Sequence, residues 1–198
     1  MEQEPAAWRN AAMACCLSLF GMTVASILEE ADNSNITRDL DVVELWSGVG
    51  RVAGAGRARG YRVATFDIED DPSQDLTTLD GFRKALRLVL RLVPGGLLWM
   101  GVQCSSWVWL NVKNTKRSLM NLWGDDSYPA TRLGNIMIKA AGIYLLVGTA
   151  RDVHWAVENP PGFLFTLLDI ICLRFIRGAW CKYCTDRCAH MPRLVRPH

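Results

Sequence analysis

The chain has 198 residues, of which 50% are apolar and 21% are charged. This composition is typical of a soluble globular protein and excludes a disordered or fibrous chain. The length suits one domain with a sizeable core, and the net charge of +2 by itself says little about partners.

Charge and cysteine are unevenly distributed along the chain. Residues 1–40 carry six acids against two bases, whereas residues 174–198 carry six bases against one acid. A basic end can meet phosphate or an acidic partner, although a solvated tail has the same composition. The seven cysteines are an odd number and are scattered. They favour reduced thiols and an intracellular protein, of the nucleus or cytoplasm, over a disulfide framework.

Residues 1–40 are expected to form an N-terminal helix, from about Ala6 to Ala31. Residues 11–28 carry no charge, and the length of this stretch is near the lower limit for a membrane span. Its small and polar residues, however, lower its hydrophobicity. Because the preceding residues are acidic, a secretory signal is disfavoured. We therefore expect a buried or amphipathic helix, not a membrane anchor.

Strands and helices alternate through residues 41–178, which we expect to form one α/β domain. The expected strands are 41–46, 62–66, 97–100 and 153–157, and the expected helices are about 51–60, 80–93, 130–150 and 163–177. The strands are apolar on both faces, which predicts a mostly parallel sheet with helices on both faces. In such sheets ligands bind beyond the carboxyl ends of the strands, where the unusual motifs of this chain lie.

Gly48 and Gly50 follow the first of these strands, at a strand-to-helix turn. Their missing side chains allow a ligand to approach the backbone amides. With Ala53 they match a loose dinucleotide-binding fingerprint, and Asp67 lies about where a ribose-binding acid is expected. Glu44, however, would repel a pyrophosphate and favours a cationic ligand without phosphate, such as S-adenosyl-L-methionine. A tight turn that binds nothing is the alternative.

Residues 44–50, Glu-Leu-Trp-Ser-Gly-Val-Gly, resemble the first motif of the cytosine-5 DNA methyltransferases, which reads acid-Leu-Phe-small-Gly-x-Gly. The resemblance covers roughly residues 40–165. It implies a Rossmann-like methyltransferase fold, with S-adenosyl-L-methionine as cofactor. A complete fold of this type needs two more strands after the last expected helix, and only residues 179–184 could form one, so the sheet is expected to be incomplete at its C-terminal edge. By this resemblance, Asp67 would contact a ribose hydroxyl of the cofactor, Ile68 would pack on its adenine ring and Asp75 would lie near the adenine amino group. The implied cofactor-binding residues are Glu44, Trp46, Ser47, Gly48, Gly50, Asp67, Ile68 and Asp75.

Cys104 follows the third strand, in the stretch Met-Gly-Val-Gln-Cys-Ser-Ser-Trp. A thiolate that adds to the cytosine ring activates the adjacent carbon for methylation. Such a thiol needs an electropositive setting, which Lys113, Lys116 and Arg117 on the next loop could supply while also meeting a nucleic-acid backbone. The stretch partly resembles the family's Gly-Pro-Pro-Cys-Gln-x-Phe-Ser motif, with both prolines replaced. A small residue packed at a strand end is the alternative.

Glu158 and Asn159 follow the last expected strand and resemble the family's Glu-Asn pair. The resemblance makes Cys104 the nucleophile, Glu158 the acid that holds the cytosine ring nitrogen, and Asn159 the residue that orients the pair. The target would be a cytosine flipped out of its stack or already single-stranded. Residues 159–163, Asn-Pro-Pro-Gly-Phe, also resemble the Asn-Pro-Pro-aromatic motif of methyltransferases that act on exocyclic amino nitrogens, which need no cysteine.

Residues 179–198 form a basic, cysteine-rich C-terminal segment. It contains four potential zinc ligands within ten residues, but their compact spacing is not a standard one, so no metal site is predicted. These ligands are Cys181, Cys184, Cys188 and His190.

The expected partner is nucleic acid, with DNA favoured over RNA. The chain after Glu158 is too short for the family's target-recognition region. This leaves a second class of function, a catalytically inactive, truncated methyltransferase-fold module that acts by binding. A protein partner that completes the sheet or the recognition region is a further possibility, whereas a membrane contact is not expected.

Overall fold

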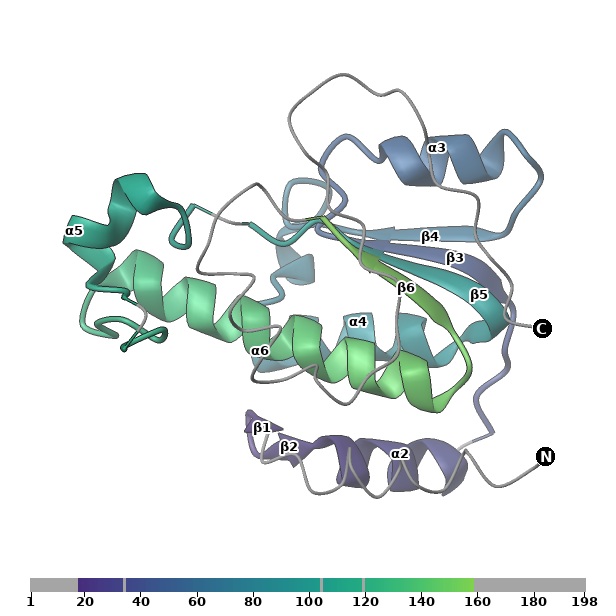
Figure 1. Ribbon diagram of the computed structural model, residues 1–198. Helices are drawn as coiled ribbons and strands as arrows, with labels where there is room; N and C mark the ends of the chain where they lie inside the picture. Colours follow the sequence, from purple (N-terminus) through teal and green to yellow (C-terminus); the bar gives the residue numbers. More distant parts are fainter. Residues whose placement is uncertain (1–17, 34, 104, 119, 159–198) are drawn as a thin grey trace, which may run out of the picture.

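A computed structural model describes residues 18–33, 35–103, 105–118 and 120–158. Its sheet has four strands in the order β4-β3-β5-β6, and every pairing between them is parallel. The strands are β3 (Leu40–Leu45), β4 (Val63–Phe66), β5 (Leu92–Met100) and β6 (His154–Val157). Helix α3 (Arg51–Arg57) covers one face, and α4 (Leu79–Leu90) and α6 (Pro129–Ala150) cover the other (Figure 1). The predicted α/β architecture with a parallel sheet flanked by helices is confirmed.

Helix α4 shows why the sequence folds into this arrangement. Thr78 caps its first turn by accepting a hydrogen bond from the Gly81 amide, and the apolar residues at spacings of three and four are buried. Phe82, Ala85 and Val89 are fully buried. The helix ends at Leu90, three residues before the predicted end, because Leu92 already pairs with Leu40 in the sheet.

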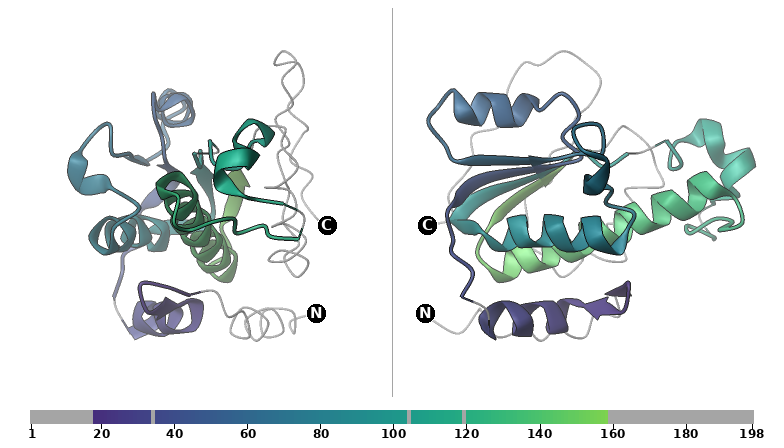
Figure 2. Two further views of the ribbon diagram at one scale, coloured as in Figure 1. Left: turned by 90° about the vertical axis from the view of Figure 1, so that its left-hand side faces the viewer. Right: turned by 180° about the vertical axis from the view of Figure 1, so that it is seen from behind.

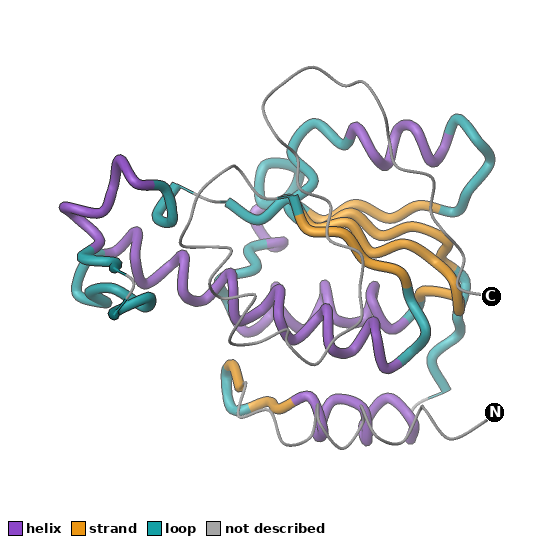
Figure 3. Tube along the Cα trace, viewed as in Figure 1, coloured by secondary structure: helices purple, strands orange, loops and turns teal. Residues whose placement is uncertain are grey.

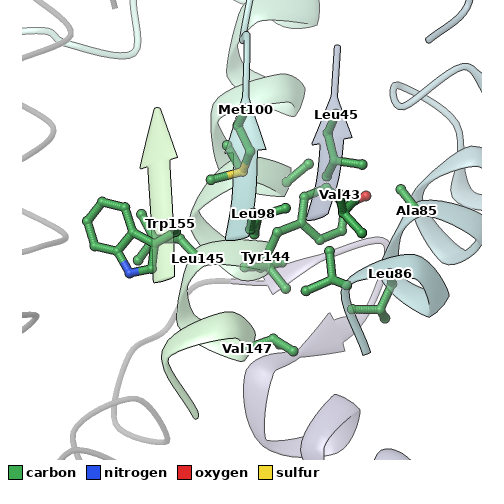
Figure 4. Packing of buried hydrophobic residues seen from close by; sticks show 14 of the residues in the cluster. Val43, Leu45, Ala85, Leu86, Leu98, Met100, Tyr144, Leu145, Val147 and Trp155 are labelled. Atoms are coloured by element: carbon green, nitrogen blue, oxygen red, sulfur yellow. The ribbon is translucent and has the colours of Figure 1, made fainter. Parts of the chain in front are cut away.

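Helix α6 connects the layers of the core. Tyr144 is fully buried, stacks on Phe82 with ring centroids 5.1 Å apart, and donates a hydrogen bond to the Phe82 carbonyl. Figure 4 shows Tyr144 and Leu145 of α6 beside strand residues Leu98 and Val43. The helix is long and apolar enough to cross a membrane, but 56% of its most apolar window is buried inside the protein. That burial is typical of a core helix.

The N-terminal helix expected from about Ala6 to Ala31 is wrong over residues 18–23. These residues form a small hairpin of β1 (Ser18–Leu19) and β2 (Met22–Thr23), and α2 covers only Val24–Asn33. The turn between the strands has φ angles of 53° at Phe20 and 76° at Gly21, which a helix cannot accommodate. Helix α2 packs under α4 and α6 as an outer layer (Figure 2).

Several predictions fall outside the described residues: the first part of the N-terminal helix, the helix at 163–177, and the segment 179–198 with Cys181, Cys184, Cys188 and His190. The division into domains and the incomplete C-terminal edge of the sheet therefore stay predictions.

The order of the strands creates a switch point in the sheet. The chain passes from β3 outward to β4 and then crosses back to β5 on the other side of β3. The loops that leave the carboxyl ends of β3 and β5 therefore diverge to opposite sides (Figure 3). A crevice at this point is where open parallel sheets bind ligands.

Candidate functional site

Three strand ends meet at Gly101, directly after β5. Its amide donates to the Leu45 carbonyl of β3, and the Glu158 amide after β6 donates to the Met100 carbonyl. A Cβ atom at Gly101 would lie 2.8 Å from the Trp46 carbonyl oxygen and 3.6 Å from the Glu158 carboxylate. The structure therefore brings the glycine loop and Glu158 to the same point, as the sequence predicts.

The loop after β3 is a tight turn with left-handed backbone conformations. Gly48 and Gly50 have φ angles of 48° and 64°, and Trp46 has a φ of 52°, which is rare for a bulky residue. The Gly50 amide donates to the Ser47 carbonyl and closes the turn. The half-buried Trp46 ring packs 6.4 Å from the Tyr144 ring, so the loop is anchored in the core.

Glu44 is buried, with 4% of its surface exposed, and its Oε2 accepts a 2.6 Å hydrogen bond from the Ala53 amide. The carboxylate therefore caps the first turn of α3 and complements the positive end of its dipole. One clear role of Glu44 is thus to hold the helix that follows the loop.

Asp67, at the end of β4, links that strand to the glycine loop. Its Oδ2 accepts a 2.8 Å hydrogen bond from the Gly48 amide, and its Oδ1 accepts one of 2.9 Å from Glu69. Its own amide donates to Oε1 of Gln74, a side chain that sequence reasoning did not select. The sequence gives no signal for this contact, because a glutamine in a polar turn is usually solvated. The next residue, Ile68, is 52% exposed and is available to pack on a ligand.

Asp75 lies in the turn before α4. Its Oδ1 accepts hydrogen bonds from the amide and the hydroxyl of Thr77, at 2.8 and 2.6 Å. A side chain at Gly81 would collide with the Asp75 carbonyl, so this turn packs directly on the start of α4. The described hydrogen bonds of Asp75 are with Thr77 and Thr78, and none joins it to the glycine loop.

Ser47 has a buried hydroxyl for which the described part of the chain provides no hydrogen-bond partner. Buried hydroxyl groups normally have one. Since Ser47 lies in the loop between the two glycines and β3, an unpaired hydroxyl there is compatible with a ligand atom or a water at this site.

Cys104 and Asn159 lie outside the described residues, so the distance between Cys104 and the exposed Glu158 stays untested. The residues next to Cys104 line a pocket of about 150 Å³. Gln103, Ser105 and Ser106 form one side, and Ala130, Leu133, Gly134 and Met137 of α6 form the other.

The sequence predicted Arg117 on an exposed basic loop, and this is wrong. The side chain is completely buried. Its guanidinium lies 3.4 Å from the centre of the Trp107 ring and donates to the carbonyl oxygens of Ser106, Leu122 and Thr131. It also donates to Oδ1 of Asn135. Burial lowers the pKa of Arg117 to about 10, opposed by the charge of Asp126, so the side chain stays charged at neutral pH.

The buried arginine therefore organises the loop after β5 and cannot contact a nucleic-acid backbone. Lys113 and Lys116, in contrast, are exposed as predicted. Sequence patterns did not reveal the role of Arg117, because an arginine in a polar loop is normally solvated.

The geometry of the site is thus a left-handed glycine turn, two buried carboxylates that hold it, and Glu158 beside it, at the switch point of a parallel sheet. Comparison with protein-family models, curated proteins and solved structures finds no match to this chain.

Proposed function

We propose that the chain has a Rossmann-like methyltransferase fold and binds S-adenosyl-L-methionine, with cytosine-5 methylation of DNA as the reaction. The observation that carries the proposal is the meeting of Trp46, Gly101 and Glu158 at the switch point of the sheet. The strand order is compatible with it, because the glycine loop follows a central strand and the acid Asp67 follows its outer neighbour.

The residues at the glycine loop fit this cofactor better than they fit a dinucleotide. Residues 67–82 contain six acids and no bases, so the turn beyond β4 favours a cation over a pyrophosphate. The exposed Ile68 supplies an apolar surface for an adenine ring, and the unpaired hydroxyl of Ser47 supplies a polar group. When bound, the cofactor supplies an electrophilic methyl group.

The remaining chemistry belongs to the chain. Cys104, as a thiolate, would add to the cytosine ring, and Glu158 would hold the ring nitrogen and donate a proton to it as the thiolate adds. Asn159 would orient Glu158. The Glu158 carboxylate lies beside Gly101, where β3, β5 and β6 end, and this position is compatible with the role.

A second candidate is a non-catalytic module of the same fold. Each carboxylate oxygen of Asp67 already accepts an amide hydrogen bond, and Glu44 caps α3. These contacts stabilise the loop without any ligand and favour a structural role. The exocyclic amino-group alternative depends on Asn159, Pro160 and Pro161, which lie outside the described residues.

Two experiments separate these functions. Calorimetric titration with S-adenosylhomocysteine tests the cofactor site, and we expect Asp67→Asn to weaken binding because its amide group cannot accept from both backbone amides. Asp70→Asn, an exposed change of the same charge in the same turn, serves as the matched control. Equal affinity for both variants would remove Asp67 from the site, and no binding to the wild-type chain would overturn the proposal.

Covalent trapping on DNA that contains 5-fluorocytosine tests the reaction. We expect a stable adduct with the wild-type chain and none with Cys104→Ser. Cofactor binding without an adduct, under conditions that trap a known enzyme of this type, would exclude the cytosine mechanism and support the binding module.

A further inference from the structure

A projecting lobe extends beyond the carboxyl edge of the sheet. It consists of residues 105–118 and 120–139 and includes η2 (Trp109–Asn111), α5 (Val112–Thr115) and the first turns of α6. Figures 1 and 2 show α5 and this end of α6 outside the layers of the core. The contacts of the buried Arg117 tie the parts of the lobe together, so its surface is presented on a fixed frame.

The lobe and the turn beyond β4 carry opposite charge. Residues 67–82 have six acids and no bases, whereas residues 105–139 have five bases and two acids. Both acids of the lobe accept hydrogen bonds from the chain itself, Asp125 from Ser127 and Asp126 from Asn135. Because Arg117 is buried, the basic surface comes from Lys113, Lys116, Arg132 and Lys139. The edge of the sheet is therefore acidic beyond β4 and basic beyond β5.

Aromatic rings lie among these bases. Trp123 and Tyr128 are 37% and 38% exposed, and Lys139 Nζ lies 5.2 Å from the centre of the Trp123 ring. Tyr128 is the N-cap residue of α6, and Arg132 and Lys139, which are seven residues apart, lie on one side of the helix. From Arg132 to Lys139 the helix rises about 10 Å, so the two basic side chains can contact different phosphates.

We propose that the projecting lobe binds single-stranded nucleic acid. The phosphates of the strand contact the lysine and arginine side chains of the lobe, and the nucleobases stack on the rings of Trp123 and Tyr128. Aromatic faces stack on unpaired bases, whereas the faces of paired bases are covered by their neighbours in a duplex. This inference rests on the proposed function, because it takes a polynucleotide as the substrate. It adds that the substrate binds on the projecting lobe and is single-stranded.

The test measures binding of a fluorescein-labelled 12-nucleotide single strand by anisotropy, with the full chain and no cofactor. We expect Trp123→Ala to weaken binding by about tenfold, the usual effect of losing one stacking platform. The pair Arg132→Gln/Lys139→Gln should reduce the slope of log affinity against log salt by roughly 1.4, since each phosphate contact on a single strand contributes about 0.7.

The pair Arg57→Gln/Arg59→Gln is the matched control, because it removes the same charge from exposed residues at and just after the end of α3, on the other face of the sheet. It should leave the salt slope unchanged. Circular dichroism during thermal unfolding verifies that each variant is folded.

Equal effects of the two charge pairs would show that net charge alone drives binding and would overturn the assignment of the lobe. Tighter binding to the matching duplex, or no binding to either form, would also overturn it. These results are independent of S-adenosylhomocysteine titration, so a failure of the lobe is distinguishable from a failure of the cofactor site.

Discussion

Gly101 offers the sharpest test of the site geometry. A Cβ atom there would lie 2.8 Å from the Trp46 carbonyl oxygen, where ordinary van der Waals contacts are 3.4–4 Å. Gly101→Ala must therefore separate the ends of β3 and β5 or distort the hydrogen bond from Gly101 to Leu45. Overpacking of this kind typically costs about 1–3 kcal/mol. For a chain of this size, a cost of about 2 kcal/mol corresponds to a decrease in Tm of roughly 4–8 °C.

The assay is urea unfolding followed by circular dichroism, with S-adenosylhomocysteine titration of the same samples. The matched control is Gly54→Ala in α3, where an added Cβ would meet nothing within 4 Å. In a helix this change should stabilise the protein by up to about 1 kcal/mol. We expect Gly101→Ala to lose both stability and ligand affinity. If it unfolds within about 0.5 kcal/mol of the wild type while Gly54→Ala behaves as expected, the strand ends do not meet as described.

Three further changes test other parts of the structure. Tyr144→Phe removes the hydroxyl that donates to the Phe82 carbonyl and should cost about 1 kcal/mol in urea unfolding; an unchanged midpoint would contradict that contact. Arg117→Met leaves several carbonyl oxygens without a donor and should cost about 3 kcal/mol, with faster amide hydrogen exchange in the projecting lobe than in β3. Equal acceleration everywhere would contradict a local role. Hydrogen bonds from Arg62 lower the pKa of Asp41 to about 2. The folded pKa is below the unfolded value of about 3.9, so this stabilisation is present above pH 4 and disappears as the pH falls towards 2. Between pH 4.5 and 2, Asp41→Asn should therefore lose less stability than the wild type, and parallel pH profiles would contradict this.

Hydrophobic patterns identified most of the sheet and the core helices, because burial of both strand faces and of one helix face leaves a clear periodicity. The prediction for residues 18–23 was wrong because hydrophobicity alone does not distinguish a helix from a hairpin. An uncharged stretch is compatible with either a helix or a hairpin, and the turn at Phe20 and Gly21 has no strong sequence signal beyond one glycine. The end of α4 was placed too late, since Leu92 and Val93 continue the apolar pattern of the helix but belong to β5.

The position of the candidate site was predictable, whereas its internal contacts were not. Motifs placed Glu44, Asp67 and Glu158 at strand ends, and a parallel sheet brings such ends to one edge. No motif indicates which amide a carboxylate accepts from, so the cap on Ala53 and the link to Gly48 became visible only in three dimensions. Arg117 was misjudged because the cost of burying a guanidinium makes that outcome rare, and only a cage of carbonyl oxygens permits it.

The cage around Arg117 also bears on how the protein folds. Its hydrogen bonds span between 5 and 18 residues of sequence, whereas the pairing of Leu45 with Met100 in the sheet joins residues 55 positions apart. Closing a short loop costs less entropy than closing a long one. The contacts of Arg117 can therefore form early, before the parallel strands align. A surface that is already ordered loses little conformational entropy when a strand binds to it.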